Sequence, residues 1–475
     1  MTDRIALVWH RRDLRVHDNP ALNRAAVENT RVLGVFVVDP AIIDDPDTAP
    51  ARVYYLRESV LELQRSYAER GGLLVVRLGE PAAVLAELAT AVGATAVHFN
   101  DDVEPYARER DARVGAVLTA RRVAVHAHPE ILLHPADAVR TQQGQPYTVF
   151  TPFWRNWSVK PKPKPFAAPE RLQSPACDPG HFPELAALGR PFAGALLVRP
   201  GERAAREQLD AVIAGILYRY GGERDLPAVA GTSQMGAHLK FGTVGIREVW
   251  LRTQQAWKAA TSDEARASVA VYQQELGWRE FYKYVLYHFP YVAEGPFRRE
   301  FERFQWDDDE ERFERWCRGE TGYPLVDAAM RQLNTVSWMH NRLRMVVASF
   351  LTKDLLIDYR RGERYFMQKL VDGDLSANNG GWQWAASVGT DPKPLRIFNP
   401  STQAERYDPE ARYIRLWLPE LAPADTRALL KVERFTPLER SRYGYPPPLV
   451  DHARQQQRFK ERYRTLKDAQ SADSS

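Results

Sequence analysis

Short apolar runs alternate with helical periodicity over the first 130 residues. The apolar runs cover residues 5–8, 32–38, 73–76 and 96–99, and the segments 51–70 and 81–92 between them repeat apolar residues at helical spacing. Continuous apolar strands with helical crossovers are typical of a parallel sheet that is covered on both faces. We therefore predict a doubly wound α/β domain over residues 1–130, with ligands near the carboxyl ends of its strands.

The pattern changes after this region. Residues 131–200 form a predicted connector, in which segment 154–171 carries five basic residues and one acid. Alternating lysine and proline at 160–165 favour extended geometry, as expected of an interdomain tether rather than a phosphate-binding arm. From residue 201 to 475 the patterns are helical, with long aromatic-rich stretches at 264–289 and 323–358 and a charged helix at 451–468. The predicted fold is α/β plus all-α.

Composition limits the protein class. The chain has 475 residues, 44% hydrophobic and 27% charged, which suits a globular protein of two or more domains. No apolar run is long enough to cross a bilayer, and the N-terminal residues do not resemble a signal peptide. Only Cys177 and Cys317 are present, which favours a reducing cytoplasm and makes a metal site unexpected. A net charge of +4 with 12 Trp, 20 Tyr and 19 Phe fits either nucleic-acid binding or a large aromatic core.

Segment 372–384 carries the most concentrated chemistry. Asp372, Asp374, Asn378 and Asn379 would each need a polar partner if buried. The diglycine at 380–381 permits close approach of a ligand or another chain segment, and Trp382 and Trp384 offer flat surfaces. The mixture predicts a polar, ring-shaped ligand beside aromatic side chains. The structural alternative is a capped turn with two packed tryptophans.

Two other segments each place three functional side chains on one helix face. They are Glu275, Trp278 and Arg279, and Asn341, Arg344 and Met345. Two such faces could line a pocket for a flat heterocycle with carbonyl and N–H edges. The alternative is a buried Glu–Arg pair that joins two helices.

A turn of small residues at 231–236 precedes a helix and could bind phosphate or simply cap that helix. The sequence contains no GxGxxG, GxxxxGK[ST], GxSxG or HExxH motif. Ordinary dinucleotide or P-loop sites, triad hydrolases and zinc proteases are therefore not supported.

Taken together and in order, these motifs resemble the photolyase/cryptochrome flavoproteins, and most closely the class I cyclobutane pyrimidine dimer photolyases. The resemblance extends from residues 9–15 to 443–446, with the most specific matches at 275–281, 321–331, 338–342 and 372–384. It implies an N-terminal antenna domain, a linker and a helical domain that holds FAD and binds DNA.

By this resemblance, Arg344 would pair with Asp372 beside the isoalloxazine, and Asn378 would face flavin N5. The full implied cofactor set is Tyr220, Arg224, Thr232, Ser233, Gln234, Met235, Gly236, Arg344, Asp372, Gly373, Asp374 and Asn378. Gly236 stands where a serine is common in the family, so one hydroxyl contact would be missing.

The implied activity is light-driven repair, in which excited reduced FAD gives an electron to a flipped-out dimer and the cyclobutane ring splits. Glu275 would stabilise the dimer radical anion. The implied substrate and DNA contacts are Glu275, Trp278, Asn341, Arg342, Met345, Trp384 and Arg406, of which Arg406 could equally be a surface arginine. DNA would be the partner of a monomeric enzyme with no obligate protein partner and no membrane association.

The residues also bear on the subtype. Asn341 and Met345 match dimer photolyases, whereas relatives that repair the 6-4 photoproduct have adjacent histidines in this helix. The chain ends soon after its last predicted helix, unlike cryptochromes with long C-terminal extensions. A blue-light photoreceptor cryptochrome without repair activity is the alternative, and a DNA-binding module is a third hypothesis.

An antenna pigment is expected in the N-terminal domain. The segment 100–111 resembles members that use 8-hydroxy-5-deazaflavin, with methenyltetrahydrofolate or FMN as alternatives, although Ala107 replaces a usual glycine. The candidates are Arg52, Asp102, Glu104, Arg110 and Lys240. A charged loop at a strand end is the structural alternative.

The family's electron relay to oxidised flavin normally has three tryptophans. Trp382 and Trp306 match the inner and outer positions, but the middle position is Tyr359. Because tyrosine is harder to oxidise unless it loses a proton, we expect slow or rerouted photoreduction, with repair by already reduced flavin intact.

Overall fold

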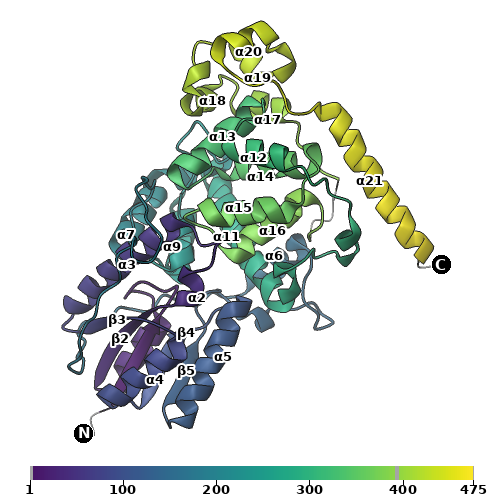
Figure 1. Cartoon of the computed structure of the whole chain (residues 1–475). Coiled ribbons are helices and arrows are strands. Elements are labelled where there is room, and N and C mark those ends of the chain that lie inside the picture. The colour runs from purple at the N-terminus through teal and green to yellow at the C-terminus, as the bar shows by residue number, and fades with distance from the viewer. Residues whose placement is uncertain (1–3, 391–394, 474–475) are drawn as a thin grey trace.

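A five-stranded parallel sheet forms the N-terminal part of the computed structural model, which describes residues 4–390 and 395–473 (Figure 1). The strands lie in the order β3-β2-β1-β4-β5. They are β1 (Ile5–His10), β2 (Arg31–Val38), β3 (Leu73–Leu78), β4 (Ala96–Asn100) and β5 (Ala124–His128). Strand β1 is buried along its whole length, as expected for a central strand with helices on both faces. The predicted doubly wound sheet is confirmed.

Each helix that follows a strand in this part begins with proline, whose fixed φ suits a first helical turn and whose missing N–H costs nothing there. These helices are α1 (Pro20–Glu28), α2 (Pro40–Ile43), α3 (Pro50–Ala68), α4 (Pro81–Val92) and α5 (Pro105–Ala120). Helices α3 and α4 confirm the two helical segments predicted from periodicity. Strand β5 was not predicted, because it lies at the sheet edge, is largely exposed and has valine as its single large apolar residue.

The strand order reverses between β1 and β4, and parallel sheets bind ligands at the carboxyl ends of strands at such a point. Arg12 follows β1, and Asp102 and Glu104 follow β4. Arg12 Nη1 lies 3.3 Å from Asp102 Oδ2 and also pairs with Glu104. The topology thus brings two of the predicted antenna residues to the crevice, where Arg12 neutralises them.

The predicted connector is only partly extended. Helix α6 (Phe150–Val159) lies within it, so residues 150–159 of the connector are helical. Phe150, Phe153 and Trp157 are spaced at helical intervals, are buried, and pack α6 against the later helix α11 (Asp263–His288). Beyond α6, Lys160 has φ −69° and ψ 137°, as in polyproline geometry, and residues 160–165 form neither helix nor strand.

The C-terminal half is helical, as predicted, and α21 extends away from its side in Figure 1. Besides α11, its helices are α7 (Glu202–Ala211), α8 (Leu217–Glu223), α9 (Gly236–Phe241), α10 (Ile246–Ala259), α12 (Glu310–Arg318), α13 (Pro324–Val336), α14 (Asn341–Ser349), α15 (Tyr359–Lys369), α16 (Leu375–Ala386), α17 (Pro400–Tyr407), α18 (Arg412–Trp417), α19 (Thr426–Leu430), α20 (Pro437–Tyr443) and α21 (His452–Asp473). Over residues 4–390 and 395–473, every helix is too short or too polar to span a lipid bilayer.

The stretch 323–358 is not one continuous helix. Ser337 adopts a left-handed conformation with φ 53° and ends α13, and π-helical turns replace α-helix over Phe350–Asp354. The break lets α14 begin at Asn341 with His340 as its N-cap, whose ring accepts a hydrogen bond from the Arg342 N–H. The first residues of α14 are thereby held in a fixed direction.

Glu280 on α11 offers a test of burial energetics. It is 1% exposed, accepts a hydrogen bond of 2.9 Å from the Leu133 N–H, and burial raises its pKa to about 7. The unfolded carboxyl ionises nearer pH 4.5, so folding stability falls as pH rises between these two values. Glu280→Gln keeps an acceptor for Leu133 without the charge. We expect it to gain roughly 1–3 kcal/mol relative to wild type between pH 4.5 and pH 8.

Urea unfolding at both pH values measures this difference. Glu248→Gln is a matched control on the neighbouring helix α10, because Glu248 pairs with Arg206, whose side chain is 42% exposed. A stability gain at Glu280 that is the same at both pH values would contradict the assigned titration.

Candidate functional site

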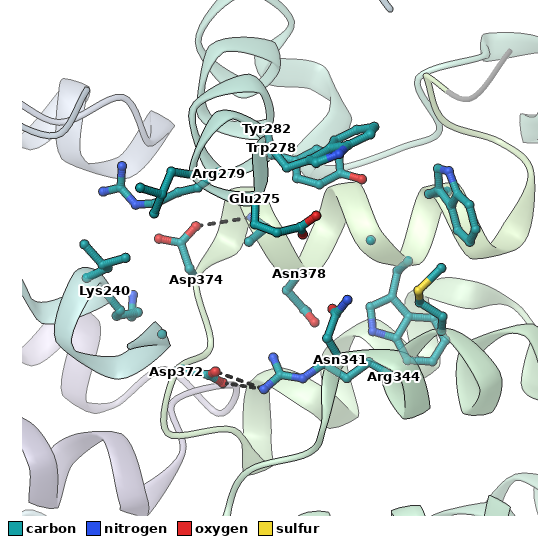
Figure 2. Close-up of a pocket in the computed structure, with 18 of the residues that line it drawn as sticks. Lys240, Glu275, Trp278, Arg279, Tyr282, Asn341, Arg344, Asp372, Asp374 and Asn378 are labelled. Atoms are coloured by element: carbon teal, nitrogen blue, oxygen red, sulfur yellow. Dashed lines mark hydrogen bonds and ion pairs between the residues drawn. The ribbon is translucent and has the colours of Figure 1, made fainter. Parts of the chain in front are cut away.

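A cavity of about 630 Å³ lies among α8, α9, α11, α14 and α16, a size typical of ligand pockets. Figure 2 shows side chains from α11, α14 and α16 facing the same space. Glu275, Trp278 and Arg279 line it from α11, and Asn341, Arg344 and Met345 line it from α14. Both predicted helix faces therefore meet in one cavity.

Helix α16 presents the segment 372–384 to this cavity. Asp374 caps the helix by accepting a hydrogen bond of 3.2 Å from the Ala377 N–H. Asn378, Gly381, Trp382 and Trp384 then line the wall. The Asn378 side-chain N–H donates to the Glu363 carbonyl at 3.0 Å, which leaves its amide oxygen as an acceptor toward the cavity.

The two adjacent glycines of α16 have different surroundings. A Cβ at Gly380 would overlap the ring of Tyr282, so α11 and α16 approach closely there. A Cβ at Gly381 would meet no atom within 4 Å, because this position opens onto the cavity. One glycine is required by packing, and the other leaves space beside the wall.

Arg344 and Asp372 form an ion pair, in which Arg344 Nη2 donates to both carboxylate oxygens at 2.9 and 3.1 Å (Figure 2). Arg344 Nε also donates to the Met339 carbonyl at 2.8 Å, so the guanidinium is held at both ends. A Cβ at Gly236 would lie 2.6 Å from Asp372 Oδ2. In this chain, close approach of α9 to Asp372 gives a physical reason for glycine at position 236.

Glu275 pairs with Arg224, at 2.6 Å between Glu275 Oε1 and Arg224 Nη1. Their side chains are 28% and 25% exposed, so this Glu–Arg pair lies in a cavity wall and not in a dry contact between helices. Trp278 stacks on Phe150 with ring centroids 3.6 Å apart, which fixes its orientation.

The small-residue turn before α9 supplies part of the wall. Tyr220, Ser233, Met235, Gly236 and Gly373 line the cavity, whereas Thr232 and Gln234 are outside its lining. Lys240 of α9, predicted as an antenna residue, also lines this cavity. Burial lowers the Lys240 pKa to about 8, and no carboxylate of the described residues lies within ion-pair distance of its amine. The cavity therefore has a cation that suits an anionic group.

A buried charge cluster joins the two halves of the molecule at Asp374. Lys283 Nζ lies 2.7 Å from Asp374 Oδ2, and Arg12 pairs with the same oxygen. Burial opposes ionisation, but the charges of Lys283, Arg12 and Lys240 hold the pKa of Asp374 well below its usual range. Arg12 also pairs with Asp102 and Glu104, and thus connects the crevice of the sheet with the cavity.

Sequence reasoning missed Arg12 and Lys283 as site residues. Arg12 lies within the family-like segment 9–15, and Lys283 follows Arg279 by four residues on α11. These two positions in the sequence were the signals that could have identified Arg12 and Lys283 as site residues.

The other antenna candidates do not form one cluster. Arg52 is buried, with its Nη2 2.5 Å from the Asp47 carbonyl and its guanidinium against Gly373. Arg110 contacts Asp111 at 3.0 Å and lies over the ring of Trp9. Arg52 thus packs beside the cavity loop, and Arg110 lies toward the sheet.

Arg342 and Arg406 lie outside the cavity lining. Their guanidinium carbons are 4.6 and 5.2 Å from the ring centroid of Tyr407. Arg342 also pairs with Asp225 at 2.8 Å, and Asp225 lies 3.9 Å from the cavity residue Arg224. The two arginines therefore form one cluster that adjoins the cavity.

Of the three relay candidates, only Trp382 lines the cavity. Tyr359 is 3% exposed, and within the part of the chain that the structure describes no ring contact joins it to Trp382 or Trp306. Trp306 contacts Phe304, with centroids 4.4 Å apart.

Comparisons with known proteins agree over almost the whole chain. The family model described as the FAD binding domain of DNA photolyase matches residues 272–465, and that described as DNA photolyase matches residues 6–170. A curated relative from Synechococcus sp., named deoxyribodipyrimidine photo-lyase, is 47% identical over 98% of this chain and 97% of its own length.

Two solved structures show the same fold. The class III photolyase from Agrobacterium tumefaciens has a TM-score of 0.91 and 34% identity, with 98% of each chain covered. The archaeal photolyase from Sulfolobus tokodaii, whose structure contains two FAD molecules, has a TM-score of 0.83 and 32% identity over 97% of this chain and all of its own.

Proposed function

We propose, on the premise that this chain belongs to the photolyase/cryptochrome family of flavoproteins, that it repairs cyclobutane pyrimidine dimers in DNA with light. The chain is an enzyme of the deoxyribodipyrimidine photo-lyase kind. One observation carries the proposal on substrate and mechanism: most of the predicted flavin residues line the same cavity as the predicted dimer residues Glu275, Trp278, Asn341, Met345 and Trp384.

The cavity suits FAD. The Arg344–Asp372 pair and the Asn378 amide offer donors and acceptors to a ring system, and Lys240 suits a phosphate. The open space at Gly381 leaves room beside these groups. When bound in its reduced form, FAD supplies the light-excited electron for repair.

The residues nearest to a bound dimer would position it. Trp278 is supported by Phe150, and Trp384 lies against Phe398, with centroids 6.1 Å apart. Two supported indole faces can stack on the bases of a flipped-out dimer, and base–aromatic stacking contributes about 1–3 kcal/mol per base. Glu275 would accept a base N–H, and Asn341 and Met345 would contact the dimer from α14.

The arginine cluster around Tyr407 supports the DNA part of the proposal. Arg342 adjoins the cavity through Asp225, and Arg406 shares the Tyr407 ring with Arg342. Both arginines would contact phosphates on either side of the lesion. The proposed partner is DNA that contains pyrimidine dimers, bound by a monomer in the cytoplasm.

We also propose a photolyase subtype, an antenna pigment and a domain division for this chain. The class I subtype rests on Asn341 and Met345, and the 8-hydroxy-5-deazaflavin antenna rests on Arg52, Asp102, Glu104, Arg110 and Lys240; methenyltetrahydrofolate and FMN are the alternatives. The proposed division is an antenna domain at 1–130, a linker at 131–200 and a catalytic domain at 201–475.

Illumination of purified protein with ultraviolet-irradiated oligothymidylate tests this function. We expect the protein to show flavin absorption and to remove dimers in the light. No dimers should be lost in the dark. Flavin photoreduction without dimer loss would favour a cryptochrome. Absence of a chromophore together with salt-sensitive DNA binding would favour a DNA-binding module.

Glu275→Gln tests the role of the carboxylate in repair. We expect several-fold fewer dimers split per absorbed photon with an unchanged flavin spectrum, because the amide keeps the size of the side chain but not its charge. Glu248→Gln again provides a control on α10. Equal repair by all three proteins would contradict the role proposed for Glu275.

A further inference from the structure

A second row of aromatic rings leads away from Trp382. Trp316 of α12 is fully buried, and its ring centroid is 6.1 Å from that of Trp382 with the planes at 73°. Tyr365 of α15 lies beyond it, 5.8 Å from Trp316 between centroids, and is half-buried. The row therefore starts at the cavity wall, where Trp382 lies, and ends at a side chain that reaches water.

An electron-transfer path through Tyr359 is unfavourable. Burial raises the pKa of Tyr359. Among residues 4–390 and 395–473, none accepts a hydrogen bond from its hydroxyl. Oxidation of a phenol is favourable only when its proton can leave, and in the described part of the chain the Tyr359 hydroxyl has no hydrogen-bonded acceptor and its ring has no contact with Trp382.

Trp316 and Tyr365 have the features that Tyr359 lacks. An indole can lose an electron and keep its proton, and Trp316 Nε1–H donates to the Val347 carbonyl at 3.1 Å, which would stabilise a positive ring. The Tyr365 hydroxyl donates to Asn334 Oδ1 at 2.6 Å near the surface. Lys369 Nζ lies 5.4 Å from the Tyr365 ring centroid and disfavours a second positive charge there, so proton loss to water would accompany oxidation.

We propose that Trp316 and Tyr365 carry the electron deficit of Trp382 to the surface when an oxidised flavin in the cavity is reduced by light. This inference rests on the proposed function for the presence of flavin. Trp382 gives one electron to the excited oxidised flavin, Trp316 returns one to Trp382, and Tyr365 returns one to Trp316 while releasing its phenolic proton to water. A thiol in solution then restores Tyr365 with one electron and one proton, and two oxidised thiols join as a disulfide.

Laser-flash absorption and electron paramagnetic resonance of the purified, oxidised holoprotein test this path. Wild type should form a long-lived neutral tyrosyl radical. Trp316→Phe should lower the yield of any long-lived radical, and the rate of photoreduction with thiol, at least several-fold. Tyr365→Phe, at a half-buried position, should replace the tyrosyl signature with a tryptophanyl one.

Tyr359→Phe and Trp306→Phe are the matched controls, and both should retain the wild-type radical. The path is wrong if Trp316→Phe and Tyr365→Phe behave as wild type, or if the two controls abolish the radical. Dimer repair by chemically pre-reduced protein is measured for all five proteins. Absence of dimer repair by the wild-type protein would refute the proposed function. Normal repair together with unchanged radicals in Trp316→Phe would refute only the electron path through Trp316 and Tyr365.

Discussion

Replacing Asp374 by alanine should destabilise the protein by about 3–5 kcal/mol, because the change leaves buried cations without their shared carboxylate. Lys283 is 2.7 Å from that carboxylate, and Arg12 pairs with the same oxygen. The change also removes the N-cap of α16, on which Asn378 and Trp382 are carried. We expect the purified variant to have lost most of its flavin, since both the charge cluster and the cavity wall depend on this residue.

Asp374→Asn is the matched control, because asparagine can cap a helix without a charge. It should restore the cap but not the ion pairs, and its stability should lie between those of alanine and wild type. Urea unfolding measures stability, and the ratio of flavin to protein absorbance measures occupancy. Equal stability of the asparagine variant and wild type would show that the buried charges contribute little.

The pH dependence of this effect has a definite sign. The pKa of Asp374 is depressed in the folded protein, so its stabilisation is present above the unfolded value near pH 4 and is lost as pH falls toward the folded value. The difference between wild type and Asp374→Asn should therefore be full at pH 7 and shrink below about pH 4. A difference that grows on acidification would contradict the proposed ion pairs.

The fold and half of the cavity could be predicted because their patterns are local. The buried strands and helices α3 and α4 follow from apolar runs and periodicity within a few residues. Glu275 and Trp278 could be placed on one face because helix geometry relates residues three and four apart. Strand β5 was not predicted because this edge strand lacks an apolar run. Helix α6 was not predicted because the proline-rich stretch that follows it favoured an extended connector.

Long-range contacts within the site could not be predicted in the same way. Arg12 and Asp374 lie 362 positions apart, and no spacing in the sequence relates them. Lys240 was assigned to the antenna from the resemblance, but its place in the cavity wall follows from the packing of α9 on the loop at 372–374. Trp316 lies in a short, highly charged helix, where only the folded chain shows that its ring reaches Trp382.

The adjacent glycines of α16 should respond in opposite ways to substitution. Gly380→Ala places a Cβ against the Tyr282 ring, and overpacking of this kind costs about 1–3 kcal/mol. Gly381→Ala meets no atom within 4 Å and removes the entropy cost of a helical glycine, so it should stabilise the apoprotein by about 0.5–1 kcal/mol. Thermal unfolding of both variants after flavin removal measures this contrast.

The variant Gly381→Leu distinguishes an effect on folding stability from an effect on flavin occupancy of the cavity. A leucine at this position would project into the cavity beside Asn378 and Trp382, where the proposed isoalloxazine would lie. We expect a folded protein, at least as stable as the wild-type apoprotein, that copurifies with little or no flavin and splits no dimers. Gly380→Ala should show the reverse, with lower stability but flavin still bound. Full flavin content in Gly381→Leu would mean that the cavity between α11 and α16 does not hold the cofactor, since no ring system could share that space with the added side chain.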